Sequence, residues 1–406
     1  MNKLLLIGNG FDLAHGLPTS YKNFIDDIWK NLAYNYNDSE IKKVFDISPR
    51  LVKFLLQRKI ENFVDFNNHL QKVLSNNNFS YRTDILFAED SFKREVLLEV
   101  KNNFFILINS KNSIQNWVDI ENVYYLELKK IVKTRNIDRV KKEKIIKLNK
   151  EFNEVKNLLI KYLREKILQN FDIEKSENRK EFLEMYNIFK PNSSLNDNEW
   201  IDLEFSIPGD WECIQEVYSK ESESKKIKCY PYIVNFNYTN SAFPYYWEMN
   251  KSLSMENGNI NNIHGEIDSE EFKPVFGFGD EMDDDYKLIE ELDDNEYLKF
   301  FKSFQYFHNN TYDNLLREID GEKFQAVILG HSCGLSDRVL LNTIFEHKNC
   351  RSIKIYYHQK EDGTDNYLDV VKNISRHFKD KPSMRRKIVS KELSSPLPQN
   401  VRFKKK

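Results

Sequence analysis

Four short stretches of the chain contain residue types that can bind a nucleotide and move a proton. Each comes at or directly after an apolar run, and they are Gly8-Asn9-Gly10-Phe11-Asp12, Asn237-Tyr238-Thr239, His264-Gly265 and Gly330-His331-Ser332. Glycine lets the backbone approach a phosphate closely, and histidine has the side chain whose pKa lies nearest neutrality. Together these residues predict a nucleotide site with a proton acceptor beside it.

The first stretch follows Lys3-Leu4-Leu5-Leu6-Ile7, an apolar run typical of a buried strand. We expect the backbone N–H groups of Gly8 to Asp12 and the following helix to receive phosphates, while Asp12 could instead cap that helix. Leu13 stands where a dinucleotide fingerprint has its third glycine, and no Gly-Lys-Ser/Thr follows, so ATP hydrolysis of the phosphate-loop type is not indicated. A tight turn without ligand remains the alternative.

His264 is the candidate general base, and Asn237 is the candidate for orienting a water molecule or the ribose hydroxyls. His331 and Ser332 are expected to contact the ribose or the adenine of the nucleotide, and Thr239 and Gly330 are further candidates for the same nucleotide site. The alternative for His264 is a buried, hydrogen-bonded histidine in a tight turn.

Strand-like runs precede all of these residues, over residues 3–10, 231–240 and 324–332, with a short run that ends at Ile263. Residues 352–358 are a further strand candidate. Because ligands bind outside the carboxyl ends of parallel strands, the polar residues are expected to line one cleft. The predicted fold is α/β, with a doubly wound parallel sheet made from residues 1–22 and 226–378.

Residues 23–225 are predicted to form a large, mostly helical insertion, because apolar residues recur there with helical spacing. One such stripe runs from Phe24 to Leu32, and another from Ile145 to Leu168. Residues 379–406 are basic and are expected to form a flexible tail. An echo of Trp117-Val118-Asp119-Ile120-Glu121 occurs as Trp200-Ile201-Asp202-Leu203-Glu204, read either as two packed helices or as acidic groups facing the cleft.

Composition excludes several classes of protein. The 406 residues carry a net charge of −2, which does not indicate a general nucleic-acid binder. No apolar run approaches the ~20 residues of a membrane helix, so no membrane partner is expected. The four cysteines form no C-x-x-C pair, which predicts no zinc knuckle and favours a cytoplasmic location.

The order and spacing of these motifs resemble those of sirtuins. Gly8 to Pro18 is similar to the sirtuin nucleotide loop, Asn235-Phe236-Asn237 to its asparagine motif, His264-Gly265 to its catalytic histidine motif, and Gly330-His331-Ser332 to the G-T-S near the adenosine. The resemblance implies NAD as a substrate. The zinc-binding cysteines of the deacetylases are absent, Thr239 replaces an aspartate and Asp12 replaces the loop serine, so no zinc is expected and hydrolysis of NAD is favoured over deacetylation.

A closer resemblance, from end to end, is to the phage abortive-infection AbiH family. Its signature is similar to Ile7–Thr19, Asn235–Asn240, Ile263–Gly265 and Leu329–Ser332 followed by Asp337. This implies an anti-phage defence protein and says less about its chemistry. Together with the sirtuin-like motifs, it favours an enzyme that hydrolyses NAD to nicotinamide and ADP-ribose when a phage trigger, either a phage protein or a nucleic acid, activates it.

Two other functions remain open. One is a non-catalytic nucleotide sensor or interaction module. The other is a metal-dependent nuclease in which Asp12, Asp202, Glu204 and Asp337 hold a divalent cation. The leading interpretation involves no metal. Whether the chain forms a homo-oligomer is left open.

Overall fold

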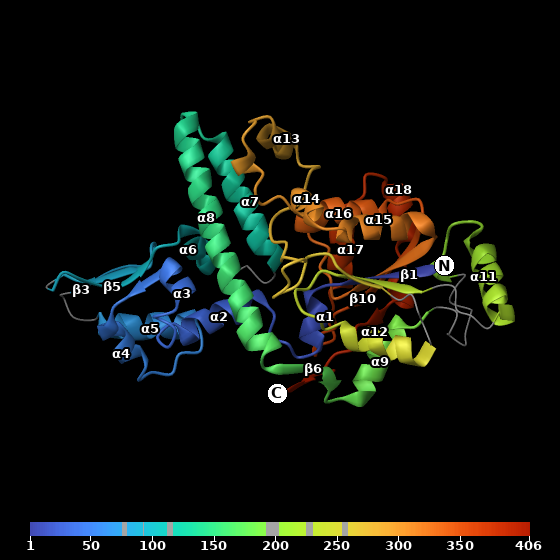
Figure 1. The fold of residues 1–406 in the computed structure, drawn as a ribbon, viewed down its shortest axis with the longest axis horizontal. Helices are drawn as coiled ribbons and strands as arrows, with labels where there is room; N and C mark the ends of the chain where they lie inside the picture. Colours follow the sequence, from blue (N-terminus) through green and yellow to red (C-terminus); the bar gives the residue numbers. More distant parts are fainter. Residues whose placement is uncertain (75–78, 92, 112–116, 192–202, 225–229, 254–258) are drawn as a thin grey trace. The chain divides into compact units, whose positions relative to one another are not determined.

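The computed structural model of the protein describes residues 1–406 apart from 75–78, 92, 112–116, 192–202, 225–229 and 254–258 (Figure 1). Contacts between residues group the chain into two units. Unit 1 consists of Met1–Leu17, Ile167–Tyr286 and Phe301–Lys406, and unit 2 of Pro18–Lys166 and Lys287–Phe300.

Unit 1 is built on a six-stranded sheet in which every pair of neighbouring strands is parallel. The strands are β1 (Asn2–Ile7), β7 (Pro231–Asn235), β8 (Asn259–Asn262), β9 (Phe324–Leu329), β10 (Cys350–Tyr357) and β11 (Ser395–Pro396). Their order is β8-β7-β1-β9-β10-β11. Numbered along the chain this is 3-2-1-4-5-6, the order of a doubly wound α/β sheet. The predicted α/β class with a parallel sheet is confirmed.

Helices cover both faces of this sheet, because successive side chains of a strand point to opposite faces. Leu4 and Leu6 share a core with α15 (Thr311–Gly321), α16 (Arg338–Phe345) and α17 (Tyr367–Ser375). Leu5 and Ile7 share the opposite core with α1 (Asn9–Ala14), α9 (Arg179–Phe189) and α12 (Phe243–Leu253). Figure 1 shows α15, α16 and α17 on one side of the strands and α9 and α12 on the other.

The remaining elements of unit 1 are short strands and helices around this core. They are β6 (Phe171–Ser176), α11 (Asp210–Ser224), α14 (Lys302–Gln305), η4 (Tyr306–His308), η5 (Leu335–Asp337), α18 (Lys381–Lys387), η6 (Lys391–Leu393) and β12 (Phe403–Lys405). Two helices cross the boundary between the units, η1 (Leu163–Leu168) and α13 (Asp284–Glu290).

Unit 2 is mainly helical, as the apolar stripes predict. Its helices are α2 (Tyr21–Asn31), α3 (Ser39–Val44), α4 (Pro49–Leu55), α5 (Phe63–Val73), α6 (Asn103–Ser110), α7 (Trp117–Lys133), α8 (Asp138–Tyr162) and η3 (Asn295–Tyr297). It also contains an antiparallel sheet that the sequence did not reveal, of β2 (Phe45–Ile47), β5 (Glu95–Val100), β4 (Phe87–Asp90) and β3 (Phe79–Arg82). These strands have three to six residues, too few for a clear alternation of apolar and polar side chains.

The boundaries of the units differ from the predicted insertion at 23–225. Residues 167–225, with β6, α9 and α11, belong to unit 1. The apolar side chains of α9, among them Phe182, Met185 and Phe189, pack in the core on one face of the large sheet. Helical spacing reveals an apolar face but not the partner against which that face packs, so the pattern placed α9 with the insertion.

The C-terminal segment is packed, rather than the flexible tail expected over 379–406. β11 pairs with β10, and β12 pairs with β6 in a separate two-stranded sheet. Leu397 and Val401, which lie between β11 and β12, and Phe403 in β12 are buried. A few apolar residues among many basic ones are sufficient to anchor this segment.

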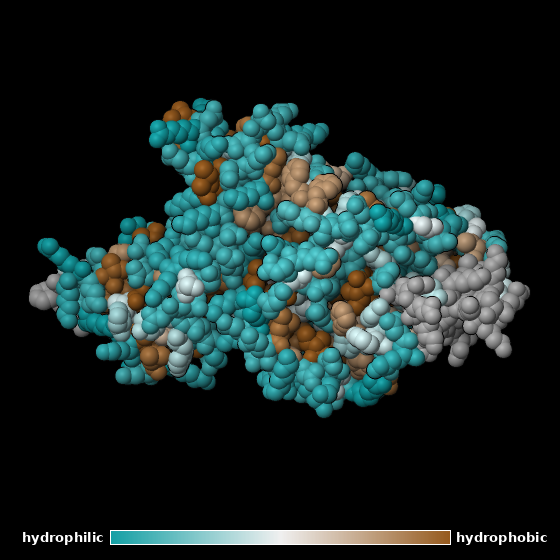
Figure 2. Space-filling model, viewed as in Figure 1, coloured by the Kyte–Doolittle hydropathy of each residue, from teal (hydrophilic) through white to brown (hydrophobic). Residues whose placement is uncertain are grey.

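The outer surface is mostly hydrophilic on the face drawn in Figure 2, in keeping with the 31% of residues that are charged. Within the part of the chain that the structure describes, no helix combines the length and the apolar character needed to cross a membrane.

Candidate functional site

The candidate residues follow the carboxyl ends of β1, β7, β8 and β9. Because these strands are parallel neighbours, their ends meet at one edge of the sheet. On one side of β1 the sheet continues with β7 and then β8, and on the other side with β9, β10 and β11. The direction in which successive strands are added therefore reverses between β1 and β9. In open α/β sheets, ligands bind in the crevice at such a reversal.

The turn after β1 packs directly against the turn after β9. A side chain on Gly8 would place its Cβ 2.5 Å from the Cα of His331, and one on Gly10 would lie 2.8 Å from the carbonyl oxygen of Gly330. Gly330 itself has a φ of +67°, and a Cβ there would lie 2.2 Å from the Phe11 nitrogen. The three glycines are therefore explained by the close approach of two backbones.

Three of the backbone N–H groups that were predicted to bind phosphate instead donate hydrogen bonds to carbonyl oxygens of the protein. Gly8 N donates to Leu329 O at 3.0 Å, Gly10 N to Gly330 O at 2.8 Å, and Phe11 N to Gly8 O at 2.9 Å. The ring of Phe11 packs among Phe189 and Tyr245 in the core on one sheet face. Asn9 and Ser332 are half-buried.

Asp12 is buried and is bound by side chains from the loop that follows β7. The amide of Asn237 donates to Gly8 O at 3.1 Å and to Asp12 Oδ1 at 2.9 Å. The hydroxyl of Thr239 lies 2.9 and 2.8 Å from the two carboxylate oxygens, and Ser241 also donates to Oδ1. The structure therefore brings Asp12, Asn237 and Thr239 together, and it adds Ser241, which no sequence motif indicated.

His264 lies at the centre of a second buried group. Its Nδ1 is 3.0 Å from Phe236 O, and its Nε2 is 3.0 Å from Asp337 Oδ1. Lys302 donates to the same Asp337 Oδ1 at 2.7 Å, and His331 Nε2 lies 3.6 Å from Asp337 Oδ2. The ring of Phe236 contacts both histidine rings. His264 and His331, predicted for one cleft, thus share one carboxylate.

The electrostatics of this group follow from burial and from Lys302. Burial, followed by the Lys302 ammonium, lowers the pKa of His264 below its ordinary value. Burial alone would raise the pKa of Asp337, but Lys302 and His264 hold it well below its ordinary value. The backbone N–H of Cys333 donates to His331 Nδ1 at 3.0 Å, so the proton of a neutral His331 is on Nε2, toward Asp337.

Lys302 is the residue of this group that sequence reasoning missed. It belongs to α14, which follows the acidic stretch near residues 280–296, and no glycine or strand end marks it. Two sequence features pointed to Asp337, its place in the AbiH signature and its carboxylate as a candidate metal ligand, and neither indicated a pairing with His264. No local sequence pattern distinguishes a buried, paired lysine from an exposed one, because the residues that surround it in space come from distant parts of the chain.

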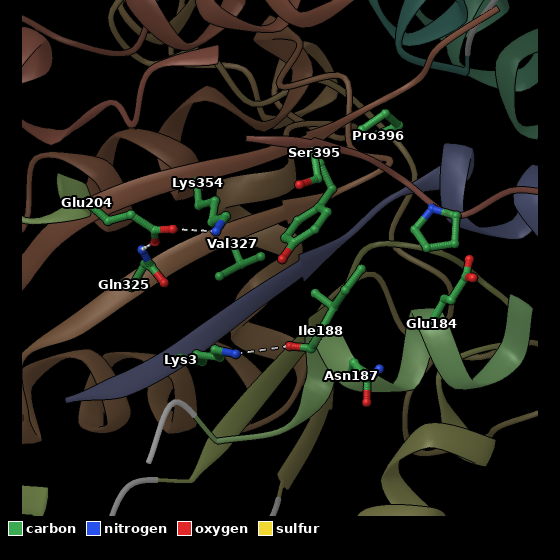
Figure 3. Close-up of a pocket in the computed structure, with 12 residues that line it drawn as sticks. Lys3, Glu184, Asn187, Ile188, Glu204, Gln325, Val327, Lys354, Ser395 and Pro396 are labelled. Carbon is green, nitrogen blue, oxygen red and sulfur yellow. Dashed lines mark hydrogen bonds and ion pairs between the residues drawn. The ribbon is translucent and has the colours of Figure 1, made fainter. Parts of the chain in front are cut away.

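Of the three proposed nuclease carboxylates that the structure describes, Glu204 lies away from Asp12 and Asp337. Asp12 and Asp337 lie at the carboxyl edge, whereas Glu204 pairs with Lys354 and with Gln325 Nε2, the latter at 2.8 Å (Figure 3). Gln325 is the second residue of β9, about 16 Å along the strand from Gly330 at ~3.3 Å per residue. Asp202 lies outside the described residues. Among the residues that are described, no group of three or more His, Cys, Asp or Glu is placed to hold a metal ion.

Glu204 instead lines a pocket of about 410 Å³ on the sheet face beside α9. Lys3 lines it as well and donates to the carbonyl oxygen of Ile188 at 3.2 Å (Figure 3). It also donates to the carbonyl oxygen of Lys190 at 2.7 Å. Burial lowers the pKa of Lys3 to about 7. These contacts anchor the end of α9. Glu121, which occupies the same position in the first copy of the repeated sequence as Glu204 does in the second, is also buried. Trp200, at the start of the second copy, lies outside the described residues.

Comparison with known proteins identifies a family. No curated protein matches the chain. The sequence model of bacteriophage abortive infection AbiH matches residues 4–359, a range that contains all the candidate residues at the carboxyl edge of the sheet. Because the match covers most of the chain, the protein belongs to the AbiH family of bacteriophage abortive infection, and its general role is in abortive-infection defence against phage.

Proposed function

We propose that the protein acts in phage defence by cleaving NAD at the bond between nicotinamide and ribose. The observation that carries this proposal is the position of His264 and Asp337 at the carboxyl edge of the sheet, beside the reversal of strand order between β1 and β9. A dinucleotide is the kind of ligand that doubly wound sheets bind there. The resemblance of the four motifs to those of sirtuins supports NAD as that dinucleotide.

The reaction needs few groups from the protein. A water oxygen forms a bond to the ribose carbon, the glycosidic bond breaks, and its electron pair leaves with neutral nicotinamide. His264 would take the proton from the water, and Asn237 would orient the water or the ribose hydroxyls. Thr239, Gly330, His331 and Ser332 are the proposed contacts of the nucleotide, together with residues 8–12.

The described geometry corresponds to a resting state in this proposal. Both ring nitrogens of His264 face acceptors of the protein, Phe236 O and Asp337 Oδ1, and the side chain is buried. A ring held in this way must leave one of these partners before it can accept a proton from water. A phage trigger would supply that change, and an NAD hydrolase that rests until infection spares its own host.

The test is NAD content in infected cells that carry the system. We expect NAD to fall and nicotinamide to appear with the wild-type protein, and His264→Ala to reduce the rate at least ~100-fold, the loss typical of a positioned acid–base group. His347→Ala is the matched control, because His347 is partly buried and pairs with Asp320, away from the carboxyl edge. Melting temperatures would verify that both variants fold.

Asn237→Ala should also reduce the rate, but it will cost stability. Its amide donates to Gly8 O and to Asp12 Oδ1, both buried, so the variant loses two hydrogen bonds, one of them to a carboxylate, at about 1–3 kcal/mol. His264→Ala is therefore the cleaner variant. Normal NAD in infected cells that still block phage would overturn the hydrolase.

A further inference from the structure

Lys302 is a buried cation to which the reaction proposed above assigns no role. Its side chain is 1% exposed, and its Nζ donates to Asp337 Oδ1 at 2.7 Å. The backbone around it is fixed, since Lys302 N donates to Phe278 O at 2.9 Å. The backbone is also packed closely on this side, because a Cβ on Gly279 would lie 2.9 Å from Ser336 O and 3.4 Å from Lys302 Cβ. The ammonium is thus held in one place beside the carboxylate.

His264 and Lys302 bind the same oxygen atom. His264 Nε2 lies 3.0 Å from Asp337 Oδ1, so the imidazole and the ammonium are only a few ångströms apart. Two acceptors face the imidazole, Phe236 O and Asp337 Oδ1, and an imidazolium would donate to both. Hydrogen bonding by itself therefore favours the charged ring, and a nearby positive charge opposes it.

Among the described residues, the other charged or titratable groups around the ring are Asp337, His331 and Tyr238. The ring of Tyr238 lies 6.2 Å from that of His264, and its hydroxyl donates to Val275 O at 2.9 Å. His331 accepts from Cys333 N through Nδ1 and directs Nε2 toward Asp337 Oδ2, an arrangement that a neutral ring satisfies. Asp337 carries one negative charge and Lys302 one positive charge, so the pair is already balanced. A proton on His264 would leave the buried group with an uncompensated positive charge, which is costly away from water.

We infer that Lys302 is a positioning residue that keeps His264 neutral, and so able to accept a proton, by sharing one carboxylate oxygen of Asp337 with it. The inference rests on the proposed function only for the statement that His264 uses its lone pair to take a proton from water. Without the lysine, Asp337 and Phe236 O would stabilise an imidazolium, which has no lone pair for a proton from water.

The test is the titration of His264 in the purified, full-length protein, followed by NMR of ring-labelled histidine, with its signal assigned by its loss in His264→Asn. In the wild-type protein we expect a neutral ring at pH 7. In Lys302→Met the midpoint should rise by about one pH unit or more, because like charges a few ångströms apart interact by more than one unit at the effective dielectric of proteins.

Arg338→Met is the matched control. Arg338 pairs with Asp280 at 2.9 Å rather than with Asp337, so its removal should leave the His264 midpoint at the wild-type value. An unchanged midpoint in Lys302→Met would overturn the inference. An imidazolium at pH 7 in the wild-type protein would also overturn it, and that measurement does not require Lys302→Met to fold. Since neither measurement uses NAD, absence of NAD cleavage would overturn the proposed function while leaving this result unaffected.

Discussion

Histidines of similar burial have different kinds of partner in this protein. His264 and His331 share Asp337 at the carboxyl edge, whereas His15, in the opening motif, is structural. His15 Nδ1 donates to Phe11 O at 2.7 Å, and its Nε2 accepts from the hydroxyl of Tyr245 at 2.5 Å. Burial raises the pKa of Tyr245 well above its ordinary value, so its hydroxyl remains a donor. Residue type therefore does not identify the catalytic candidate, but the partners of each ring do.

Stability is expected to fall as the pH is lowered from about 6.5 toward 4. Burial lowers the pKa of His15 and of His377 to about 4, while in the unfolded chain both titrate near their ordinary value of 6.5. Over that interval the unfolded state binds more protons, so acid favours unfolding, by up to about 3 kcal/mol for each histidine at pH 4. Urea unfolding at several pH values measures this loss.

His15→Asn gives the control for that titration. The variant should be less stable at pH 7.5, because it loses the bond from Tyr245, but its stability should depend less steeply on pH. Equal pH dependence in the two proteins would show that His15 does not carry this effect.

Two turns, one after β1 and one after β9, form the structural base of the site. They approach so closely that glycine is needed on both sides, at Gly8, Gly10 and Gly330. The β7 loop is attached to the first turn through Asn237, Thr239 and Ser241, which all contact Asp12. The positions of the catalytic candidates thus depend on contacts between the turns, and a change in the backbone of one turn should displace the others.

Gly330→Ala is expected to destabilise the protein by about 2 kcal/mol or more. The new Cβ would meet the backbone nitrogen of Phe11 at 2.2 Å, and the φ of +67° is itself unfavourable for alanine. Gly321→Ala is the control, since a Cβ there has no heavy atom within 4 Å, and it should change the free energy of unfolding by less than about 0.5 kcal/mol. Equal stabilities of the two variants, from denaturant unfolding, would contradict the packing explanation.

At the scale of the whole molecule, the C-terminal segment links parts of unit 1 that lie far apart in the chain. Val401 N donates to Ala14 O at 3.0 Å and Phe403 N to His15 O at 2.9 Å. The ring of Phe403 stacks on His15 with centroids 4.6 Å apart. The AbiH match ends at residue 359, yet this later segment binds the C-terminal end of α1, the helix that follows β1.

Deletion of residues 395–406 should lower stability by more than about 3 kcal/mol, because Leu397, Val401 and Phe403 would lose their buried surface. Thermal unfolding of the truncated and full-length chains provides the measurement. Replacing Lys404 and Lys405 by serine removes charge but keeps the backbone pairing of β12 with β6, so it should have little effect. Equal melting temperatures of the truncated and full-length chains would instead support the prediction of a flexible tail.

The sequence by itself determined five strands of the large sheet, the helical character of most of the remainder, the family and the edge at which the candidate residues meet. The sixth strand, β11, lies in the segment that was expected to be a flexible tail. These features depend on neighbours in the chain: an apolar run, a glycine turn, a spacing of three or four residues. The unit to which α9 belongs was not predictable in this way, nor was the small sheet of unit 2.

Only the tertiary structure decided which side chains share the site. Lys302 and Asp337 are 35 positions apart, His264 and Asp337 are 73 apart, and Asp12 and Ser241 are 229 apart. Such pairs depend on how helices and loops pack, and a lysine or serine in a loop has the same local pattern whether it faces water or a buried carboxylate. Burial and charge pairing are properties of the folded chain, and they determine whether His264 is neutral.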